Sequence, residues 1–404
     1  MKYIEGGVCA AKGFKANGIW CGIRKNKTKK DLALIFSDVM CQAAGVYTTN
    51  LVKGAPLIVT KKHLQNGMAQ AVICNSGNAN TCNENGEELA EDTCKLLAKK
   101  LKISASDVIV ASTGVIGQPM SIEPFKNGMD ELVAGLKYDN SDVANEAIMT
   151  TDTKKKQVAV EFKIGDKVCH IGGIAKGSGM IKPNMATMLV FVTTDCAISA
   201  DMLQHAISAD VQDSFNMVSV DGDTSTNDML TIMANGLAGN KEINEDGKDY
   251  NTFCEALAMV TKKLCKMIAA DGEGATKLLE CIVTGAKDVK NAKIVAKAVV
   301  MSNLLKAAMF GADANWGRVL CAIGYSGADV DITKVNVDFV SSKGGIVVCR
   351  NGAGVDFNEA KAKEILLEPE ININVGLGDG TAMATAWGCD LTYDYVKING
   401  DYRT

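Results

Sequence analysis

Short apolar runs with strand character alternate along this 404-residue chain with segments of helical periodicity. The runs that combine apolar with β-branched residues predict strands at 32–37, 56–60, 69–74, 107–112, 157–164, 188–194 and 293–301. Strands and amphipathic helices that follow one another in this way favour a mixed fold, of α/β or α+β class, in which helices pack on sheets.

Amphipathic helices are predicted where apolar residues recur every three or four positions. The stripes are Phe125, Met129, Leu132 and Leu136; Leu203, Ile207 and Val211; and Phe253, Leu257, Val260, Leu264 and Met267. Ser121 stands before the first stripe as a predicted N-cap, and the second helix is predicted to begin after Ser199. Gly272 follows the third stripe as a predicted C-cap.

Composition excludes several classes of function. The net charge of −4 lacks the basic excess of a nucleic-acid-binding surface. No apolar run reaches membrane-spanning length, and the first residues lack the layout of a signal peptide. The sequence therefore predicts a cytoplasmic protein that binds neither nucleic acid nor membrane.

The 14 cysteines are scattered from Cys9 to Cys389, without the paired spacing of a metal site. Cys74, Cys321 and Cys349 lie in apolar runs, so we interpret them as small buried hydrophobic residues in a reducing compartment. A catalytic cysteine is the alternative, but no histidine stands in a recognisable partner motif.

A glycine-rich lysine loop leads directly into a buried strand within residues 174–192. Gly177 and Gly179 allow a backbone with positive φ or a close approach to another group. The run 188–192 is continuously apolar, as expected for a strand buried on both faces. Thr187 stands at the junction, where a rigid strand can hold a nucleophile beside a loop that admits substrate.

Threonine becomes an effective nucleophile when a base takes its hydroxyl proton, and its own free α-amine is such a base. An α-amine titrates near ~8, close enough to neutral pH for this role. The Ala186–Thr187 bond would first have to break, by attack of the Thr187 hydroxyl on the Ala186 carbonyl and hydrolysis of the ester. The local pattern leaves a second interpretation open, in which Thr187 is an ordinary β-branched strand residue.

The segment KGSGMIKPNMATML closely resembles the processing-site segment of the ornithine acetyltransferase family, also called glutamate N-acetyltransferases. Further blocks similar to the family occur in this order along the chain, before and after that segment: GGVCAAKGFKANGI near the start, NSGNANTC (75–82), ASTGVIG (111–117), TTDTK (150–154), DGDTSTND (221–228), AADGEGATK (269–277), FGADANWGR (310–318) and KINGDYRT at the end. Blocks spread over the whole chain are far more specific than a single glycine motif.

This resemblance implies self-cleavage into an α chain of residues 1–186 and a β chain of residues 187–404 that remain one folded body. It also implies an αββα-like layered fold similar to the N-terminal-nucleophile hydrolases, with its own connectivity. Two copies of each fragment, an α2β2 heterotetramer, are the assembly that the family suggests.

An acyl-enzyme on Thr187 requires hydrogen-bond donors for the oxyanion of its tetrahedral intermediate. The run 107–112 delivers Thr113 and Gly114 to a turn, where the Thr113 hydroxyl and the Gly114 N–H can point at one oxygen. An ordinary strand-to-helix turn is the alternative. The matching Thr-Gly pair forms the oxyanion hole in the family, which implies this role here.

The resemblance also implies substrate contacts for Thr150, Lys176, Thr187, Glu273, Asn399 and Thr404. Lys176 offers a cation for a carboxylate, and Glu273 an anion for an ammonium group. A solvated surface lysine and an exposed acidic turn are the respective alternatives. Thr151 replaces Thr150 if the register of the match slips.

The implied reaction is ping-pong transfer of the acetyl group from N2-acetylornithine to glutamate through acetyl-Thr187, in arginine biosynthesis. No metal or organic cofactor is signalled, since the glycines at 177–179 lack the context of a dinucleotide site. The family includes members that also accept acetyl-CoA, and that co-substrate stays open here. One alternative function is a self-processing aminopeptidase or amidase, in which water is the acceptor. A non-enzymatic binding module with an unprocessed chain is the other.

Overall fold

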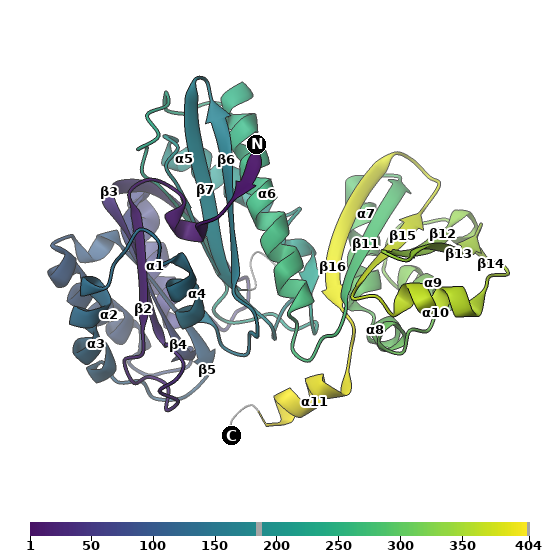
Figure 1. Ribbon diagram of the computed structural model, residues 1–404, viewed down its shortest axis with the longest axis horizontal. Coiled ribbons are helices and arrows are strands. Elements are labelled where there is room, and N and C mark those ends of the chain that lie inside the picture. Colours follow the sequence, from purple (N-terminus) through teal and green to yellow (C-terminus); the bar gives the residue numbers. More distant parts are fainter. Residues whose placement is uncertain (183–187, 402–404) are drawn as a thin grey trace. The chain divides into compact units, whose positions relative to one another are not determined.

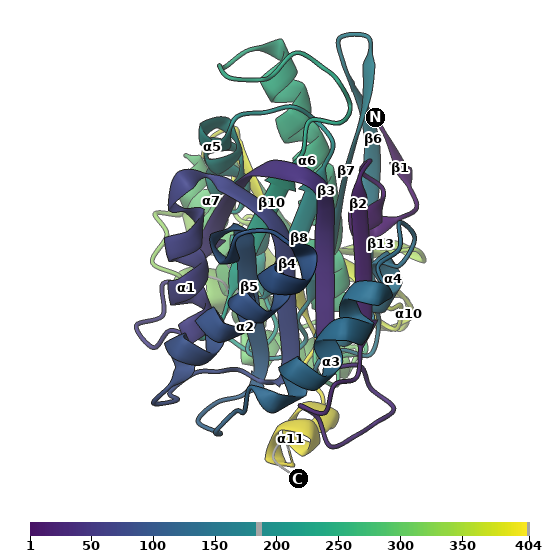
Figure 2. The same ribbon diagram turned by 90° about the vertical axis from the view of Figure 1, so that its left-hand side faces the viewer.

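Two β-sheets, one of nine and one of seven strands, organise the described residues (Figures 1 and 2). This computed structural model describes residues 1–182 and 188–401. Of these, 1–177, 188–216 and 224–264 form unit 1, and 178–182, 217–223 and 265–401 form unit 2. The chain therefore passes from one unit to the other within the glycine-rich lysine loop.

The sheet of unit 1 has the strand order β1-β6-β7-β8-β10-β3-β4-β5, and β2 pairs with β3 beside this path. The strands are β1 (Lys2–Ile4), β2 (Phe14–Ile19), β3 (Leu32–Tyr47), β4 (Met68–Asn78), β5 (Val108–Val115), β6 (Lys156–Ile164), β7 (Lys167–Lys176), β8 (Leu189–Thr194) and β10 (Met229–Ala234). The interior strands β8 and β10 are parallel to each other, and every residue of both is buried. The predicted strand at 188–194, buried on both faces, is thereby confirmed.

Alternate residues of the long strand β3 serve two different cores. Leu32 and Leu34 pack with one set of helices, whereas Ala33 and Ile35 belong to the cluster on the other face. The helices of unit 1 are α1 (Ala55–His63), α2 (Gly86–Leu101), α3 (Glu123–Ala134), α4 (Ser141–Ile148) and α5 (Ala200–Asp210). Helices α2 and α3 cover the leucine face, and α4 contributes to the other (Figure 2). A sheet covered in this way buries both sides of each strand.

The sheet of unit 2 has the order β14-β13-β12-β15-β11-β16-β9. Its strands are β9 (Val218–Ser219), β11 (Leu278–Ala286), β12 (Asn336–Ser341), β13 (Gly344–Arg350), β14 (Ala353–Gly354), β15 (Glu370–Gly376) and β16 (Ala382–Cys389). Its helices are α7 (Val289–Met301), α8 (Asn303–Phe310), α9 (Trp316–Gly324), α10 (Glu359–Leu366) and α11 (Tyr393–Gly400). Helix α6 (Lys248–Ala270) begins in unit 1 and ends in unit 2.

Strands β12 and β15 of unit 2 have buried residues at alternate positions, unlike the interior strands β8 and β10 of unit 1. In β15 the residues Ile371, Ile373 and Val375 are buried, and the residues between them are partly exposed. Helix α7 packs on β11 and β16, so one face of this sheet carries the apolar contacts within the unit. Period-two alternation is typical of such half-buried strands.

The predicted strands at 32–37, 69–74, 107–112 and 157–164 are confirmed as parts of β3, β4, β5 and β6. Two other strand predictions are wrong, because 56–60 lies in helix α1 and 293–301 lies in helix α7. Pro56 occupies the first turn of α1, a position that suits a residue without an N–H group. The mixed α/β class is confirmed.

The predicted helical stripes lie in α3, α5 and α6, although Leu136 and Val211 fall just beyond the helix ends. Ser199 is the N-cap of α5, and its hydroxyl accepts a hydrogen bond from the Met202 N–H. The cap prediction for Ser121 is wrong, because the N-cap of α3 is Ile122. Gly272 follows α6 without a left-handed backbone; a Cβ at this position would lie 2.8 Å from Cys389 Sγ, so packing requires the glycine.

Two of the three cysteines singled out in the sequence are buried as expected, namely Cys74 and Cys349. The prediction for Cys321 is wrong, because this thiol is exposed on helix α9. No helix in the ranges that the structure describes has the length and apolar character to cross a membrane.

Candidate functional site

Thr113 and Gly114 stand near the carboxyl end of β5, where this strand runs parallel to β4. Gly114 has a φ of 135°, a backbone conformation that favours glycine. A Cβ at this position would collide with the carbonyl carbon of Gly77 on the neighbouring strand. The close approach of the two strand ends therefore requires glycine at 114.

Lys176 ends β7, and its ammonium donates a hydrogen bond to Thr113 Oγ1 at 3.3 Å. Its residue surface is only 9% exposed, so the alternative of a solvated surface lysine is wrong. Burial lowers the pKa of Lys176, whereas the nearby Asp152 and Asp228 carboxyl groups act in the opposite direction. The structure thus brings two of the predicted site residues into direct contact.

Asp152, from the TTDTK block, connects the Thr150 segment to the end of β7. Its Oδ1 accepts hydrogen bonds from Lys156 Nζ and the Gly177 N–H, each at 2.7 Å. Its Oδ2 accepts from the backbone N–H of Thr150 at 3.0 Å. Burial alone would raise the pKa of Asp152, but the Lys156 and Lys176 ammonium groups hold it well below its usual value. Asp152 is therefore an anion that links the backbone of Thr150 to that of Gly177, the residue after Lys176.

Asp228 is a second carboxyl group that faces Lys176, at the beginning of β10. Burial raises the pKa of Asp228 well above its usual value, and hydrogen bonds from Ser225 and the charge of Lys176 oppose this shift. Its Oδ2 has no hydrogen-bond partner in the described part of the chain. Asp228 therefore completes a buried cluster of two lysines and two aspartates behind Thr113.

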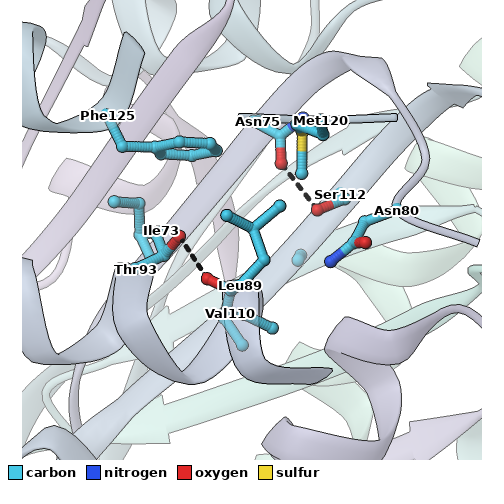
Figure 3. A pocket seen from close by; sticks show the side chains of 11 residues that line it. Ile73, Asn75, Asn80, Leu89, Thr93, Val110, Ser112, Met120 and Phe125 are labelled. Carbon is cyan, nitrogen blue, oxygen red and sulfur yellow. Dashed lines mark hydrogen bonds between the residues drawn. The ribbon is translucent and has the colours of Figure 1, made fainter. Parts of the chain in front are cut away.

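A small cavity lies among residues of β4, β5, α2 and α3 (Figure 3). It has a volume of about 10 Å³, and the Ser112 hydroxyl donates to Asn75 Oδ1 at its edge at 2.6 Å. A space of this size holds at most one water molecule. The cavity is thus too small for an amino-acid substrate.

Glu273 belongs to unit 2, in the turn after α6. Its backbone N–H donates to the Ser178 carbonyl at 2.9 Å, and the Ser178 hydroxyl donates to the Asp271 carbonyl at 2.6 Å. A Cβ at Gly179 would collide with the Glu273 carboxylate, which confirms the predicted close approach at this glycine. Glu273 is 7% exposed, so the alternative of an exposed acidic turn is wrong.

Asn399 lies on α11 and donates from Nδ2 to Glu273 Oε2 at 2.8 Å, so unit 2 brings these two predicted site residues together. Ala186, Thr187 and Thr404 lie outside the described residues. The chain resumes at Met188, and Leu189, two positions after Thr187, pairs directly with Lys176 in the β7–β8 register.

Sequence reasoning missed Asp152 and Asp228, although both lie inside quoted blocks. Each acts through contacts with a lysine from a different part of the chain, and neither shows a local signature. The only available signal was the carboxylate in each block; TTDTK precedes the predicted strand at 157–164, whereas the strand β10 after DGDTSTND was not predicted.

Comparisons with known proteins cover nearly the whole chain. A family model described as the ArgJ family matches residues 15–404. The arginine biosynthesis bifunctional protein ArgJ 1 of Clostridium acetobutylicum is 50% identical over 392 residues, covering 97% of this chain and 96% of that protein. The ArgJ protein of Symbiobacterium thermophilum is 51% identical over 406 residues, covering 100% of both chains.

A solved structure is similar as well. The crystal structure of the ArgJ protein of Bacillus halodurans shares 47% sequence identity and a TM-score of 0.50, covering 52% of this chain and 97% of that chain. The family match and the full-length relatives agree with the order of the sequence blocks. The chain belongs to the ArgJ family.

Proposed function

We propose that this protein transfers the acetyl group of N2-acetylornithine to glutamate, by way of an acetyl ester on Thr187. Ornithine leaves after the first step, and the amine of glutamate attacks the ester in the second to give N-acetylglutamate. A covalent intermediate divides a difficult exchange between two amines into two easier steps.

The hydrogen bond from Lys176 to Thr113 is the observation that carries this proposal. A lysine that donates to the Thr113 oxygen leaves the hydroxyl proton free to point at another acceptor, such as a developing oxyanion. Gly114 adds a backbone N–H at the same strand end. Because Leu189 pairs with Lys176, strand β8 begins beside the residue that donates to Thr113.

Charged groups of both signs support an amino-acid substrate. We assign Lys176 to the substrate carboxylate and Glu273 to the side-chain ammonium of ornithine, with Asn399 holding the Glu273 carboxylate at 2.8 Å. Thr150, fixed through Asp152, and Thr404 complete the proposed contacts. Buried charges are retained in proteins where they are paired or have a ligand to meet.

We further propose that the chain cleaves itself between Ala186 and Thr187. The pairing of β7 with β8 would hold the α chain of residues 1–186 and the β chain of residues 187–404 together as one body. The solved chain from Bacillus halodurans is covered over 97% of its length but matches only 52% of this chain, the share expected for one fragment of a divided protein. Ala186 offers little steric hindrance to the attack.

The proposed enzyme is cytoplasmic, needs no metal or organic cofactor, and assembles as an α2β2 heterotetramer. Acetyl-CoA is a further proposed donor, because the relatives in Clostridium acetobutylicum and Symbiobacterium thermophilum are described as bifunctional. Both donors would load the same threonine, so a single acetyl-enzyme serves either reaction.

An aminopeptidase or amidase that hydrolyses the same intermediate is the alternative function. The test uses the mature protein with N-acetylornithine, in the presence and absence of glutamate, and follows release of ornithine. Mass spectrometry of the 187–404 fragment should show one added acetyl group that disappears when glutamate is supplied. Sustained ornithine release without glutamate would instead establish hydrolysis.

A further inference from the structure

Asn227, in the DGDTSTND block, uses every hydrogen-bonding position of its side chain within unit 1. Its Nδ2 donates to the carbonyl oxygens of Ala79 at 2.6 Å and Ser112 at 2.9 Å. Its Oδ1 accepts from the hydroxyl groups of Thr81 at 2.6 Å and Thr226 at 2.7 Å. The residue is 4% exposed, so these bonds form away from solvent.

These hydrogen bonds connect Asn227 to the residues on either side of the Thr113–Gly114 pair. Ser112 immediately precedes the pair, and the Asn227 amide holds its carbonyl directly. Val115 immediately follows, and its carbonyl accepts from the Ala79 N–H at 2.9 Å. The carbonyl of that same Ala79 is the other acceptor of the Asn227 amide. One side chain is thus bonded directly to the residue before the two donors and, through Ala79, to the residue after them.

The surroundings give this amide no room to turn. A Cβ at Gly54 would lie 2.5 Å from Asn227 Nδ2. The Gly54 N–H donates to the Thr226 carbonyl at 2.9 Å, which holds the preceding residue in place. A buried amide with all four positions satisfied is rigid, because any rotation would leave buried polar atoms without partners.

We propose that Asn227 is a positioning residue that sets the orientation of Thr113 and Gly114 as oxyanion donors. This inference rests on the proposed function, in which those two residues stabilise the tetrahedral intermediate. Oxyanion donors act only within a narrow distance range of the developing charge, and a displacement on the order of 1 Å can slow an enzyme by ~100-fold. Asn227 does not itself contact the reacting atoms in this proposal.

The test is Asn227→Asp, which keeps the shape of the side chain but replaces the donating amide with an oxygen that repels the Ala79 and Ser112 carbonyls. We expect kcat for acetyl transfer from N-acetylornithine to glutamate to fall by about 100-fold. The KM values should change by less than about threefold, because the donors act mainly in the transition state. Rates are expressed per amount of 187–404 fragment, so incomplete cleavage does not count as slow transfer.

Asn240 offers a matched control within the same unit. Its Nδ2 donates to the carbonyls of Ala197 at 3.0 Å and Lys241 at 2.8 Å, and its Oδ1 accepts from the Ala197 N–H at 2.8 Å. Asn240→Asp therefore makes the same chemical change at a buried amide that does not touch the β5 end. It should lower Tm to a similar extent while leaving kcat within about threefold of the parent protein.

Two further variants keep the test decisive if Asn227→Asp does not fold. Thr226→Val removes one donor to Asn227 Oδ1 and should lower kcat by roughly 3- to 10-fold. In a Thr113→Val background the same change should have a much smaller effect, since coupled residues are not additive.

The outcomes separate the inference from the proposed function on which it rests. If Thr113→Val slows transfer but both Asn227→Asp and Thr226→Val behave like the Asn240 control, the inference is overturned and the proposed function stands. If Thr113→Val itself leaves kcat unchanged, the oxyanion assignment fails and the inference fails with it.

Discussion

Thr113→Val should separate catalysis from substrate binding, because valine keeps the branched shape and removes only the hydroxyl. Thr113 is 9% exposed, so the change exposes no new surface. The lost oxygen accepts the Lys176 ammonium at 3.3 Å, and the lost proton is the proposed oxyanion donor. One substitution thus removes a ground-state contact and a transition-state contact, which have different magnitudes.

Loss of one oxyanion donor costs about 3 kcal/mol of transition-state stabilisation, or roughly a 100-fold decrease in kcat. The hydrogen bond to Lys176 is longer than average, so its loss should lower the free energy of unfolding by only about 1 kcal/mol. That bond stabilises the charged lysine, whose pKa burial already lowers. The valine variant should therefore lower the Lys176 pKa further and shift the alkaline limb of the kcat profile to lower pH.

The assay is steady-state transfer from N-acetylornithine to glutamate across a pH series, with Tm measured in parallel. Thr113→Ser is the control, because serine retains the hydroxyl and should keep most of the activity. A kcat near that of the parent protein, together with KM values raised for both substrates, would refute the reasoning. Thr113 would then be a ground-state binding residue.

Three further predictions address the nucleophile, the substrate charge and the buried ion pair. Thr187→Ala should abolish both chain cleavage and transfer, whereas Thr187→Ser should retain part of each; denaturing electrophoresis and the transfer assay measure them. Glu273→Gln should slow the ornithine half-reaction more than the glutamate half-reaction, and equal losses by mass spectrometry of the acetyl-enzyme would contradict the charge assignment. Folding lowers the pKa of Asp152, so its carboxylate stabilises the fold above about pH 4, and this stabilisation is lost as the pH falls toward the folded pKa. Asp152→Asn should therefore lower the free energy of unfolding at pH 7 by about 3 kcal/mol and flatten the acid side of the Tm profile.

Sequence patterns predicted five of the nine strands in the sheet of unit 1, among them β4, β5 and β8, whose apolar runs leave a clear signal. Strands β1, β2, β7 and β10 were not predicted. The same signal failed at 56–60 and 293–301, where apolar and β-branched residues belong to the buried helices α1 and α7. A short apolar run has no period that separates a buried helix from a buried strand. Strand β15 was not predicted, although its apolar residues alternate with polar ones in the sequence.

Site residues could be predicted from the sequence where the resemblance assigned them a role, and the other residues of the site could not. Lys176, Thr113 and Glu273 were found through the resemblance, and the structure adds that all three are buried. Their roles stay predictions. Asp152 and Asn227 escaped notice because their contacts include hydrogen bonds to the backbone of distant segments, namely the Gly177 N–H and the Ala79 and Ser112 carbonyls, and such bonds exist only once the chain is folded.

The antiparallel pairing of β7 with β8 has a consequence for how such a protein can be made. Before cleavage, these strands are joined by a short connection, and their association is an intramolecular step with a high effective concentration. In the cleavage proposed above, the same pairing would become an association of two separate polypeptides, and the apparent stability would depend on protein concentration. A mature protein that is fully denatured must therefore reassemble by a slower bimolecular reaction, with its fragments exposed to aggregation in the meantime. The proposed cleavage would therefore have to follow folding, because the intact chain folds in an intramolecular reaction and the separated fragments would have to find each other in solution.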